Sequence, residues 1–541
     1  MAVCTSGQTS LDQARVGTAQ PNEPHGSYLG AGYTLRMEKR RTAHTSTTHR
    51  PVLSLVNLGC SKNLVDSERI LGQLAEHGFL IASDPAEAEL CVVNTCGFID
   101  AAREETAGVL RELSELKEHG QLKTIVAVGC LVERVADAPE LNRFLGHADA
   151  RLGFKDYPRM AEICSELIAT QQKAAADRHG VSDTKYAMAT RSYVEGPRES
   201  AAKKKVPKSY NDFLISPRLR IGAPHSAYLK IAEGCNNPCK FCAIPRMRGL
   251  QVSRPLEDIV REAQSLIEGG AKEINLIAQD TTTYGQDLYG RHDLARLLRA
   301  LSAEIKDQVW FRLMYAYPRH LNAEMLDALV SDPRFCRYID MPLQHFADEM
   351  LEAMSRKVTK KQTLELLDLI ERKLPGAALR TTFIVGFPGE TERHFEEVLR
   401  LVETQRFTHA GVFLYSTEPL TPAAKLPDDV PLAEKQRRRD VLMRAQREVS
   451  RSKMLARIGQ TVEVLVDGPL AQGVDAPQGA RAIARSPSEA PEVDGLVFLK
   501  GKGVAALAPG DFVRARIKSA YDYDVLALLD ESVKSTASTH A

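Results

Sequence analysis

The chain is 541 residues long, more than a single hydrophobic core accommodates, so we expect about two to four domains. Its 71 lysine and arginine residues nearly balance 70 aspartate and glutamate residues, which excludes binding of nucleic acid through a large overall positive charge. The sequence has neither an apolar run of membrane-spanning length nor a secretory signal, so we expect a cytoplasmic protein with no membrane segment. In that reducing compartment, its ten cysteines favour metal binding or catalysis over disulfides.

Residues 1–50 are polar, rich in threonine, serine, glycine and arginine, and lack sustained periodicity, so we predict a disordered N-terminal tail. Met37 is an alternative start of translation to Met1. The Lys-Arg-Arg sequence that follows it is most simply a solvated charge cluster, with contact to RNA as the other interpretation.

From 51 to 167, short apolar runs typical of strands alternate with helical patterns. This alternation predicts a doubly wound, parallel α/β domain at the N-terminus. The predicted strands span 53–57, 90–94 and 124–128.

Three cysteines of this domain follow the three predicted strands. Cys60, Cys96 and Cys130 each come just after a strand, and the carboxyl ends of parallel strands lie at one edge of a sheet. We therefore expect the three thiols to converge in space as a three-thiolate metal site, against the alternative that their positions are coincidental. Cys91 lies within its strand and is better interpreted as a core residue.

Residues 168–220 are predicted to be a long, partly disordered linker. The β-α alternation then resumes over 221–452, where six units in series predict a full or partial TIM-like (β/α) barrel. Ser253 is a plausible cap for the helix predicted at 255–267. The six predicted strands span 228–232, 273–278, 310–315, 338–341, 379–385 and 411–415.

A loop with C-x3-C-x2-C spacing follows the first of these strands and carries Cys235, Cys239 and Cys242. Three close thiolates without a local fourth favour an iron–sulfur cluster with one open iron, and zinc is the serious alternative. The ends of the other strands carry polar side chains, which a substrate site at the barrel mouth requires. For His345, structural and catalytic roles both stay open. These strand-end residues are Gln279, Asp280, Tyr317, Gln344, His345, Glu390 and Glu418.

Residues 453–535 change to short strands with Gly, Pro and Asp turns, which predicts a small β-barrel. Barrels of this size bind RNA or dock on protein, and the sequence favours neither. Residues 536–541 are predicted to be a disordered tail.

Beyond residue 50, the ordered set of motifs resembles the radical S-adenosylmethionine methylthiotransferases, and the terminal barrel resembles their TRAM domain. The resemblance rests on Gly59-Cys60-Ser61-Lys62-Asn63, Asn94-Thr95-Cys96-Gly97, Gly129-Cys130 and the Cys235/Cys239/Cys242 loop.

This resemblance implies an enzyme with two 4Fe–4S clusters. Cys235, Cys239 and Cys242 would hold the catalytic cluster, whose open iron takes S-adenosylmethionine and yields a 5′-deoxyadenosyl radical. Phe241 would lie beside the adenine. A second S-adenosylmethionine would provide the methyl group. The auxiliary cluster, which delivers sulfur, would be held by Cys60, Cys96 and Cys130.

Within this family, the segments 57–68, 278–282 and 380–390 resemble the branch that modifies a ribosomal protein. The implied target is the β-carbon of an aspartate in the twelfth protein of the small ribosomal subunit. The alternatives are a tRNA adenosine methylthiotransferase and a non-catalytic iron–sulfur RNA-binding protein. Leu420 stands where the family commonly has glycine, and 472–479 resembles an insertion.

The family also implies partners. We expect the small-subunit ribosomal protein or the ribosome as substrate, and an electron donor of the flavodoxin or ferredoxin type. The sequence does not indicate the sulfur donor. We expect the chain to act as a monomer.

Overall fold

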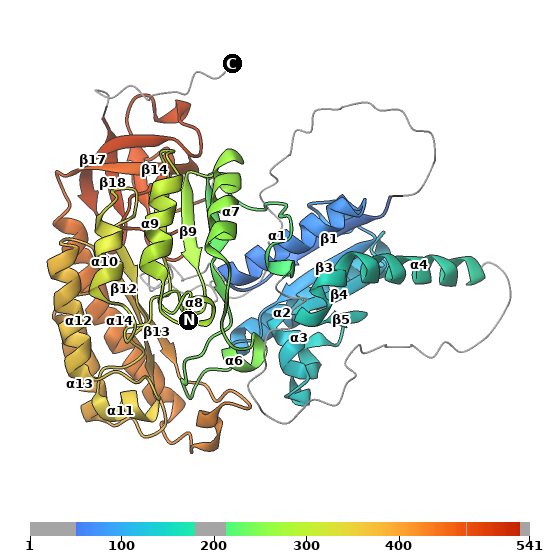
Figure 1. The fold of residues 1–541 in the computed structure, drawn as a ribbon, viewed down its shortest axis with the longest axis horizontal. Helices are drawn as coiled ribbons and strands as arrows, with labels where there is room; N and C mark the ends of the chain where they lie inside the picture. The colour runs from blue at the N-terminus through green and yellow to red at the C-terminus, as the bar shows by residue number, and fades with distance from the viewer. Residues whose placement is uncertain (1–49, 179–211, 472, 531–541) are drawn as a thin grey trace, which may run out of the picture. The chain divides into compact units, whose positions relative to one another are not determined.

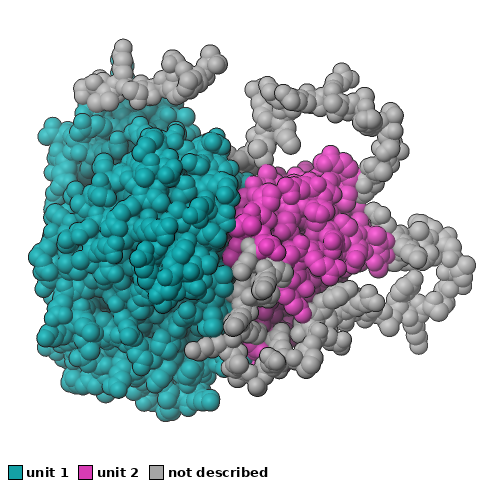
Figure 2. Space-filling model, viewed as in Figure 1, with its two compact units in different colours: residues 1–3, 200–206, 220–541 teal, residues 4–199, 207–219 magenta. Residues whose placement is uncertain are grey.

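The computed structural model describes residues 50–178, 212–471 and 473–530. The predicted tails, the alternative start at Met37 and the central part of the predicted linker lie outside the described residues. The described chain forms two compact units (Figure 2): residues 50–178 with 212–219, and residues 220–530. The half-barrel and the C-terminal barrel described below therefore belong to one unit.

The first unit is built on a five-stranded parallel sheet with the order β2-β1-β3-β4-β5. Helices α1 and α4 contact one another, and α2 and α3 both contact η2, so helices flank the sheet in two groups (Figure 1). This confirms the predicted α/β fold of the N-terminal region. The strands are β1 (Val52–Asn57), β2 (Leu80–Ile81), β3 (Leu90–Thr95), β4 (Thr124–Gly129) and β5 (Ala150–Leu152), and the helices are α1 (Ser61–Glu76), η1 (Pro85–Glu87), α2 (Asp100–His119), α3 (Cys130–Val135), η2 (Pro139–Leu145), η3 (Phe154–Arg159) and α4 (Met160–Arg178).

Residues 212–219 pack against α1 of the first unit. The amide of Leu219 donates to the carbonyl of Glu68 (2.9 Å), and Arg218 Nε donates to the Glu68 carboxylate (3.1 Å). Gly72 leaves room for this segment, because a Cβ there would lie 2.8 Å from the carbonyl carbon of Pro217. Part of the predicted linker thus packs as ordered structure, and α4 continues to Arg178. The predicted domain boundaries stay predictions.

The second unit contains six parallel strands in two three-stranded sheets, β10-β9-β6 and β11-β12-β13. The amide of Ala316 donates to the carbonyl of Asp340 (2.8 Å). This bond joins the two sheets into a six-stranded partial barrel, as predicted, which is called the half-barrel below. The strands are β6 (Ser226–Lys230), β9 (Glu273–Ile277), β10 (Trp310–Leu313), β11 (Tyr338–Asp340), β12 (Ala378–Val385) and β13 (His409–Leu414), with the short pair β7 (Ala232–Glu233) and β8 (Val252–Ser253) beside them.

Helices cover the outer face of the half-barrel (Figure 1). Ile259, Ala263 and Leu266 of α7 are buried in the same core as the strands, as expected for an amphipathic helix. The helices are α6 (Ile244–Met247), α7 (Leu256–Glu268), α8 (Gln286–Tyr289), α9 (Leu294–Glu304), α10 (Ala323–Val330), α11 (Asp348–Ala353), α12 (Lys360–Lys373), α13 (Glu392–Glu403), η4 (Pro422–Lys425) and α14 (Leu432–Leu455).

The prediction that Ser253 caps α7 is wrong. Pro255 occupies the N-cap position, and no side chain caps the helix. Ser253 lies instead at the end of β8, where its hydroxyl accepts a hydrogen bond from the amide of Gly285 (3.0 Å).

The C-terminal strands close into a barrel of order β14-β15-β16-β18-β17, which confirms the small β-barrel. Buried charges join this barrel to the half-barrel at the end where the parallel strands begin. Arg485 Nη1 donates to the Glu273 carboxylate (2.8 Å), and Arg312 pairs with the same carboxylate (3.0 Å). The barrel comprises β14 (Thr461–Pro469), β15 (Ala482–Arg485), β16 (Val497–Lys500), η5 (Val504–Ala506), β17 (Phe512–Ala520) and β18 (Val525–Leu529).

Leu420 has a left-handed backbone (φ 67°) and a side chain that is 39% exposed. We expect Leu420→Gly to raise the free energy of unfolding by about 0.5–1 kcal/mol, because relief of about 1–2 kcal/mol of strain exceeds the entropic cost of glycine. Leu426 is equally exposed but has ordinary extended backbone (φ −85°), so Leu426→Gly should lower stability. Urea unfolding of the two variants measures both effects, and a loss of stability in both would contradict the prediction.

Candidate functional site

The C-x3-C-x2-C loop leaves the short strand β7 at the end of the half-barrel where the parallel strands finish. Gly234 begins the loop with φ 77°, and a Cβ there would lie 2.7 Å from the carbonyl oxygen of Gly249. The amide of Cys235 donates to that same carbonyl (3.1 Å). Only glycine allows this close approach, which fixes where the first cysteine emerges.

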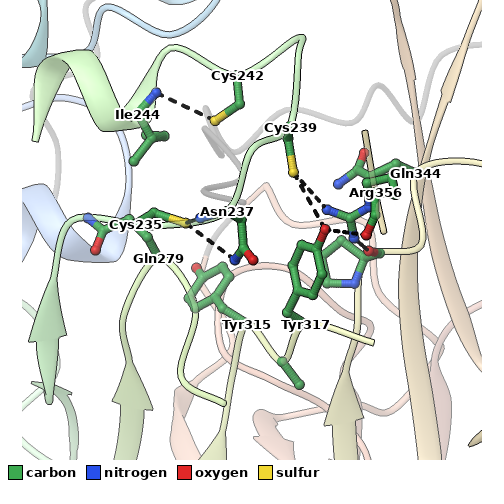
Figure 3. Close-up of a pocket in the computed structure, with 12 residues that line it drawn as sticks. Cys235, Asn237, Cys239, Cys242, Ile244, Gln279, Tyr315, Tyr317, Gln344 and Arg356 are labelled. Atoms are coloured by element: carbon green, nitrogen blue, oxygen red, sulfur yellow. Dashed lines mark hydrogen bonds between the residues drawn. The ribbon is translucent and has the colours of Figure 1, made fainter. Parts of the chain in front are cut away.

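Each of the three sulfurs in the loop accepts a hydrogen bond from an N–H group (Figure 3). The amide and side-chain nitrogens of Asn237 each donate to Cys235 Sγ at 3.4 Å, and the amide of Ile244 donates to Cys242 Sγ at 3.5 Å. Arg356 Nη1 donates to Cys239 Sγ at 3.4 Å. This donor set suits sulfurs that carry negative charge, as metal-bound thiolates do.

The three cysteines line a hollow of about 500 Å³, counting the open solvent at its mouth. Tyr315 and Gln344 line it with left-handed backbones (φ 61° and 73°), and backbone strain of this kind concentrates at functional sites. The lining residues are Cys235, Asn237, Cys239, Cys242, Ile244, Gln279, Tyr315, Ala316, Tyr317, Pro342, Gln344 and Arg356.

Burial controls the charge state of the site. It raises the pKa of the Cys235 thiol to about 12, with Asp280 adding to the effect, and it also raises the pKa of the Cys242 thiol. Cys235 and Cys242 therefore stay protonated until a metal displaces their protons. Burial alone would raise the pKa of Glu233 too, but Arg248 (2.8 Å) and Lys230 (2.7 Å) hold that pKa well below its ordinary value.

Five sequence-predicted residues do not line the hollow: Phe241, Asp280, His345, Glu390 and Glu418. Phe241 is buried in a hydrophobic cluster with Tyr317 and Phe387, so its role beside adenine stays a prediction. His345 is also buried, and its Nδ1 accepts a hydrogen bond from the amide of Ala347 (3.1 Å), which favours the structural interpretation.

Arg356 is a site residue that sequence reasoning missed. It lies in the turn between α11 and α12, not at the end of a strand. Tyr317 and Gln344, in contrast, were found through their places at strand ends.

Cys60, Cys96 and Cys130 of the first unit converge around Asn63. Cys130 Sγ lies 3.7 Å from Asn63 Oδ1, and Asn63 Nδ2 donates to the carbonyl of Thr95 (3.1 Å), next to Cys96. Cys60 precedes α1, which carries Asn63, and all three cysteines are buried. The structure thus places these strand-end cysteines near one another at the sheet edge, and their role as a three-thiolate metal site stays a prediction.

Gly129 makes this convergence possible. Its φ is 93°, and a Cβ there would lie 2.7 Å from the carbonyl oxygen of Thr95, next to Cys96. Gly97 is similarly close to α3, because a Cβ added there would lie 2.7 Å from the Cα of Leu131. The approach of β3 to the start of α3 therefore depends on glycine on both sides.

We expect Gly129→Ala to lower the free energy of unfolding by about 3 kcal/mol, as the sum of left-handed strain and overpacking. Gly78 is the matched control, because its φ of 88° is similar but a Cβ there meets nothing within 4 Å. Gly78→Ala should cost only about 1–2 kcal/mol, the strain alone. Urea unfolding measures both, and equal losses would show that close packing at Gly129 is unimportant.

Within residues 50–178, 212–471 and 473–530, no three His, Cys, Asp or Glu side chains are arranged to hold a single metal ion. What the cysteine loop offers instead is the thiol-lined hollow. Across the same ranges, no helix has the length and apolar character needed to cross a membrane.

Three family models match the chain: the Radical SAM superfamily over residues 229–402, the TRAM domain over 458–529, and Uncharacterized protein family UPF0004 over 53–153. The first match covers the cysteine loop and most of the half-barrel. It defines the class as the radical S-adenosylmethionine enzymes, whose cofactors are S-adenosylmethionine and a 4Fe–4S cluster.

Two relatives extend the match over nearly the whole chain. The ribosomal protein uS12 methylthiotransferase RimO of Anaeromyxobacter sp. (strain K) is 43% identical over 87% of this chain and 91% of its own. The protein of the same name from Desulforamulus reducens is 41% identical over 88% and 99%. The chain belongs to the RimO family of methylthiotransferases, which confirms the resemblance seen in the motifs.

Among solved structures, the radical S-adenosylmethionine methyltransferase TsrM from Kitasatospora setae is similar with a TM-score of 0.46 and 16% identity, over 69% of this chain and 74% of that one.

Proposed function

We propose that this protein adds a methylthio group to the β-carbon of an aspartate in ribosomal protein uS12, using S-adenosylmethionine and two 4Fe–4S clusters. The observation that carries the proposal is the hollow at the strand ends, where three cysteine sulfurs each accept an N–H hydrogen bond. The name that the relatives carry supports the substrate.

Cys235, Cys239 and Cys242 fit the first cluster as a set of three thiols lining one hollow. Cys60, Cys96 and Cys130 fit the second, because the packing around Asn63 gathers them at one sheet edge. When bound, the first cluster with S-adenosylmethionine supplies a radical that removes hydrogen from unactivated carbon, and the second cluster supplies sulfur.

The residues around the hollow would orient and shield these groups. Asn237 holds Cys235 in place and is itself fixed by Asp280, whose carboxylate accepts from its Nδ2 (2.7 Å). The buried rings of Tyr315 and Tyr317 line the hollow and would exclude water from a reactive centre. We propose Phe241 as a support for adenine. A monomer in the cytoplasm and an electron donor of the flavodoxin or ferredoxin type complete the proposal.

Mass spectrometry of a strain that lacks this chain tests the substrate. We expect uS12 to lose one methylthio group, and the native gene to restore it, while the methylthio content of tRNA stays unchanged. A gene with Cys235, Cys239 and Cys242 replaced by alanine is the matched control and should restore nothing. Loss of methylthio groups from tRNA with uS12 still modified would overturn the proposal in favour of a tRNA enzyme.

A further inference from the structure

Arg356 is a buried cation on the wall of the hollow, only 3% exposed. Its Nη2 donates to the carbonyl of Pro342 (2.5 Å) and its Nη1 to Cys239 Sγ (3.4 Å). In the described part of the chain, no carboxylate forms an ion pair with it, and its buried Nε has no hydrogen-bond partner. A buried charge costs free energy unless an opposite charge compensates it. We therefore expect a negatively charged group in the hollow beside Arg356.

The backbone around Arg356 is strained on both sides. Ser355 and Lys357 have left-handed backbones, with φ of 57° and 55°. Each such residue costs about 1–2 kcal/mol when it is not glycine. Strain that persists in a folded protein is over-determined by its surroundings and suggests a functional constraint. Here it holds the intervening arginine towards the cysteines.

Three further contacts hold Arg356 and its turn in place. The guanidinium carbon lies 4.2 Å from the centre of the Tyr317 ring, and the Tyr317 hydroxyl donates to the carbonyl of Arg356 (2.6 Å). The amide of Lys240 donates to the carbonyl of Met354 (3.0 Å), which ties this turn to the cysteine loop. Arg356 and Cys239 are therefore positioned as one assembly (Figure 3).

We propose that Arg356 is a positioning residue that raises the reduction potential of the cluster held by Cys235, Cys239 and Cys242. Its charge and its hydrogen bond to Cys239 Sγ stabilise the reduced cluster, which carries one more negative charge than the oxidised cluster. Hydrogen bonds to sulfur and local charge are established determinants of cluster potential. The inference rests on the proposed function, because it requires a cluster at these three cysteines.

The test measures the midpoint potential of this one cluster by spectroscopically monitored redox titration. The parent is the full chain with Cys60, Cys96 and Cys130 replaced by alanine, so that only one cluster forms. We expect Arg356→Gln to lower the equilibrium constant for one-electron reduction at least tenfold, a negative shift of about 59 mV or more. Arg356→Lys keeps the charge but loses the planar fork, and should shift the potential less.

Arg334→Gln is the matched control. This guanidinium also lies over a ring, Phe311 (5.8 Å), but pairs with Asp332 and does not line the hollow, so the potential should not change. A folded Arg356→Gln variant with the parent's potential would overturn the inference. If Arg356→Gln does not fold, Arg356→Lys decides, and the parent's potential there also overturns it. A parent that binds no iron would instead show that the proposed function fails at this site.

Discussion

Replacement of Cys239 by alanine is expected to abolish both cleavage of S-adenosylmethionine and methylthiolation, a loss of more than about a thousandfold, as when a catalytic unit is removed. The substitution removes one of three thiols from the hollow and leaves Arg356 without its sulfur partner. Iron content should fall by about half if the auxiliary cluster remains. Cleavage is measured by chromatography of the adenosine product, and methylthiolation by mass spectrometry of uS12.

Cys336→Ala is the control for the loss of a buried cysteine. Cys336 is 3% exposed and does not line the hollow, so its variant should keep both activities and lose only some stability.

Cys96→Ala should separate the two reactions: cleavage persists and methylthiolation stops. Full methylthiolation by the Cys239→Ala variant would show that this thiol holds no catalytic cluster.

Glu273→Gln is expected to lower the free energy of unfolding by about 3–5 kcal/mol, the cost of breaking a buried ion pair. Glu273 is fully buried, and Arg485 and Arg312 both donate to it. With the carboxylate neutralised, two buried guanidiniums would face each other without their shared counter-charge. Urea unfolding measures the loss. Glu324→Gln is the matched control, because Glu324 pairs with Arg299 on the surface and should cost less than about 1 kcal/mol.

The Glu273 carboxylate should also make the free energy of unfolding sensitive to acid. Burial alone would raise the pKa of Glu273, but Arg485 and Arg312 lower it from 4.5 to about 2. Because the folded pKa is below the unfolded pKa, the stabilisation is fully present above about pH 4.5 and is lost as the pH falls towards 2. Unfolding free energies across this range should therefore fall more steeply for the native chain than for Glu273→Gln. Parallel pH profiles would contradict the assignment.

Sequence reasoning succeeded where position along a strand determines position in space. Cys60, Cys96 and Cys130 follow successive parallel strands, so their gathering at one sheet edge follows from the fold. The same logic placed Tyr317 and Gln344 at the mouth of the half-barrel. The small C-terminal β-barrel was likewise accessible from its short strands and turn residues.

Sequence reasoning failed where a contact between distant residues leaves no local pattern in the sequence. Arg356 lies 117 residues from Cys239 and reaches it from a turn, and nothing in the neighbouring sequence marks that arginine. Ser253 has the local signature of a helix cap, yet a tertiary hydrogen bond from Gly285 uses its hydroxyl instead. Long-range ion pairs such as Glu273 with Arg485 cannot be predicted from the sequence either, because the charge of a residue does not identify its partner.

The ion pair between Glu273 and Arg485 has a consequence for how the protein folds during its synthesis. The two residues are 212 positions apart, so Arg485 leaves the ribosome long after the strands of the half-barrel have been made. Until then, Glu273 has Arg312 as its counter-charge but lacks the cover of the C-terminal barrel. Native pairing at this end of the half-barrel must therefore wait until synthesis is almost complete. A nascent chain stalled before β15 would keep this end unfinished and exposed to chaperones and proteases.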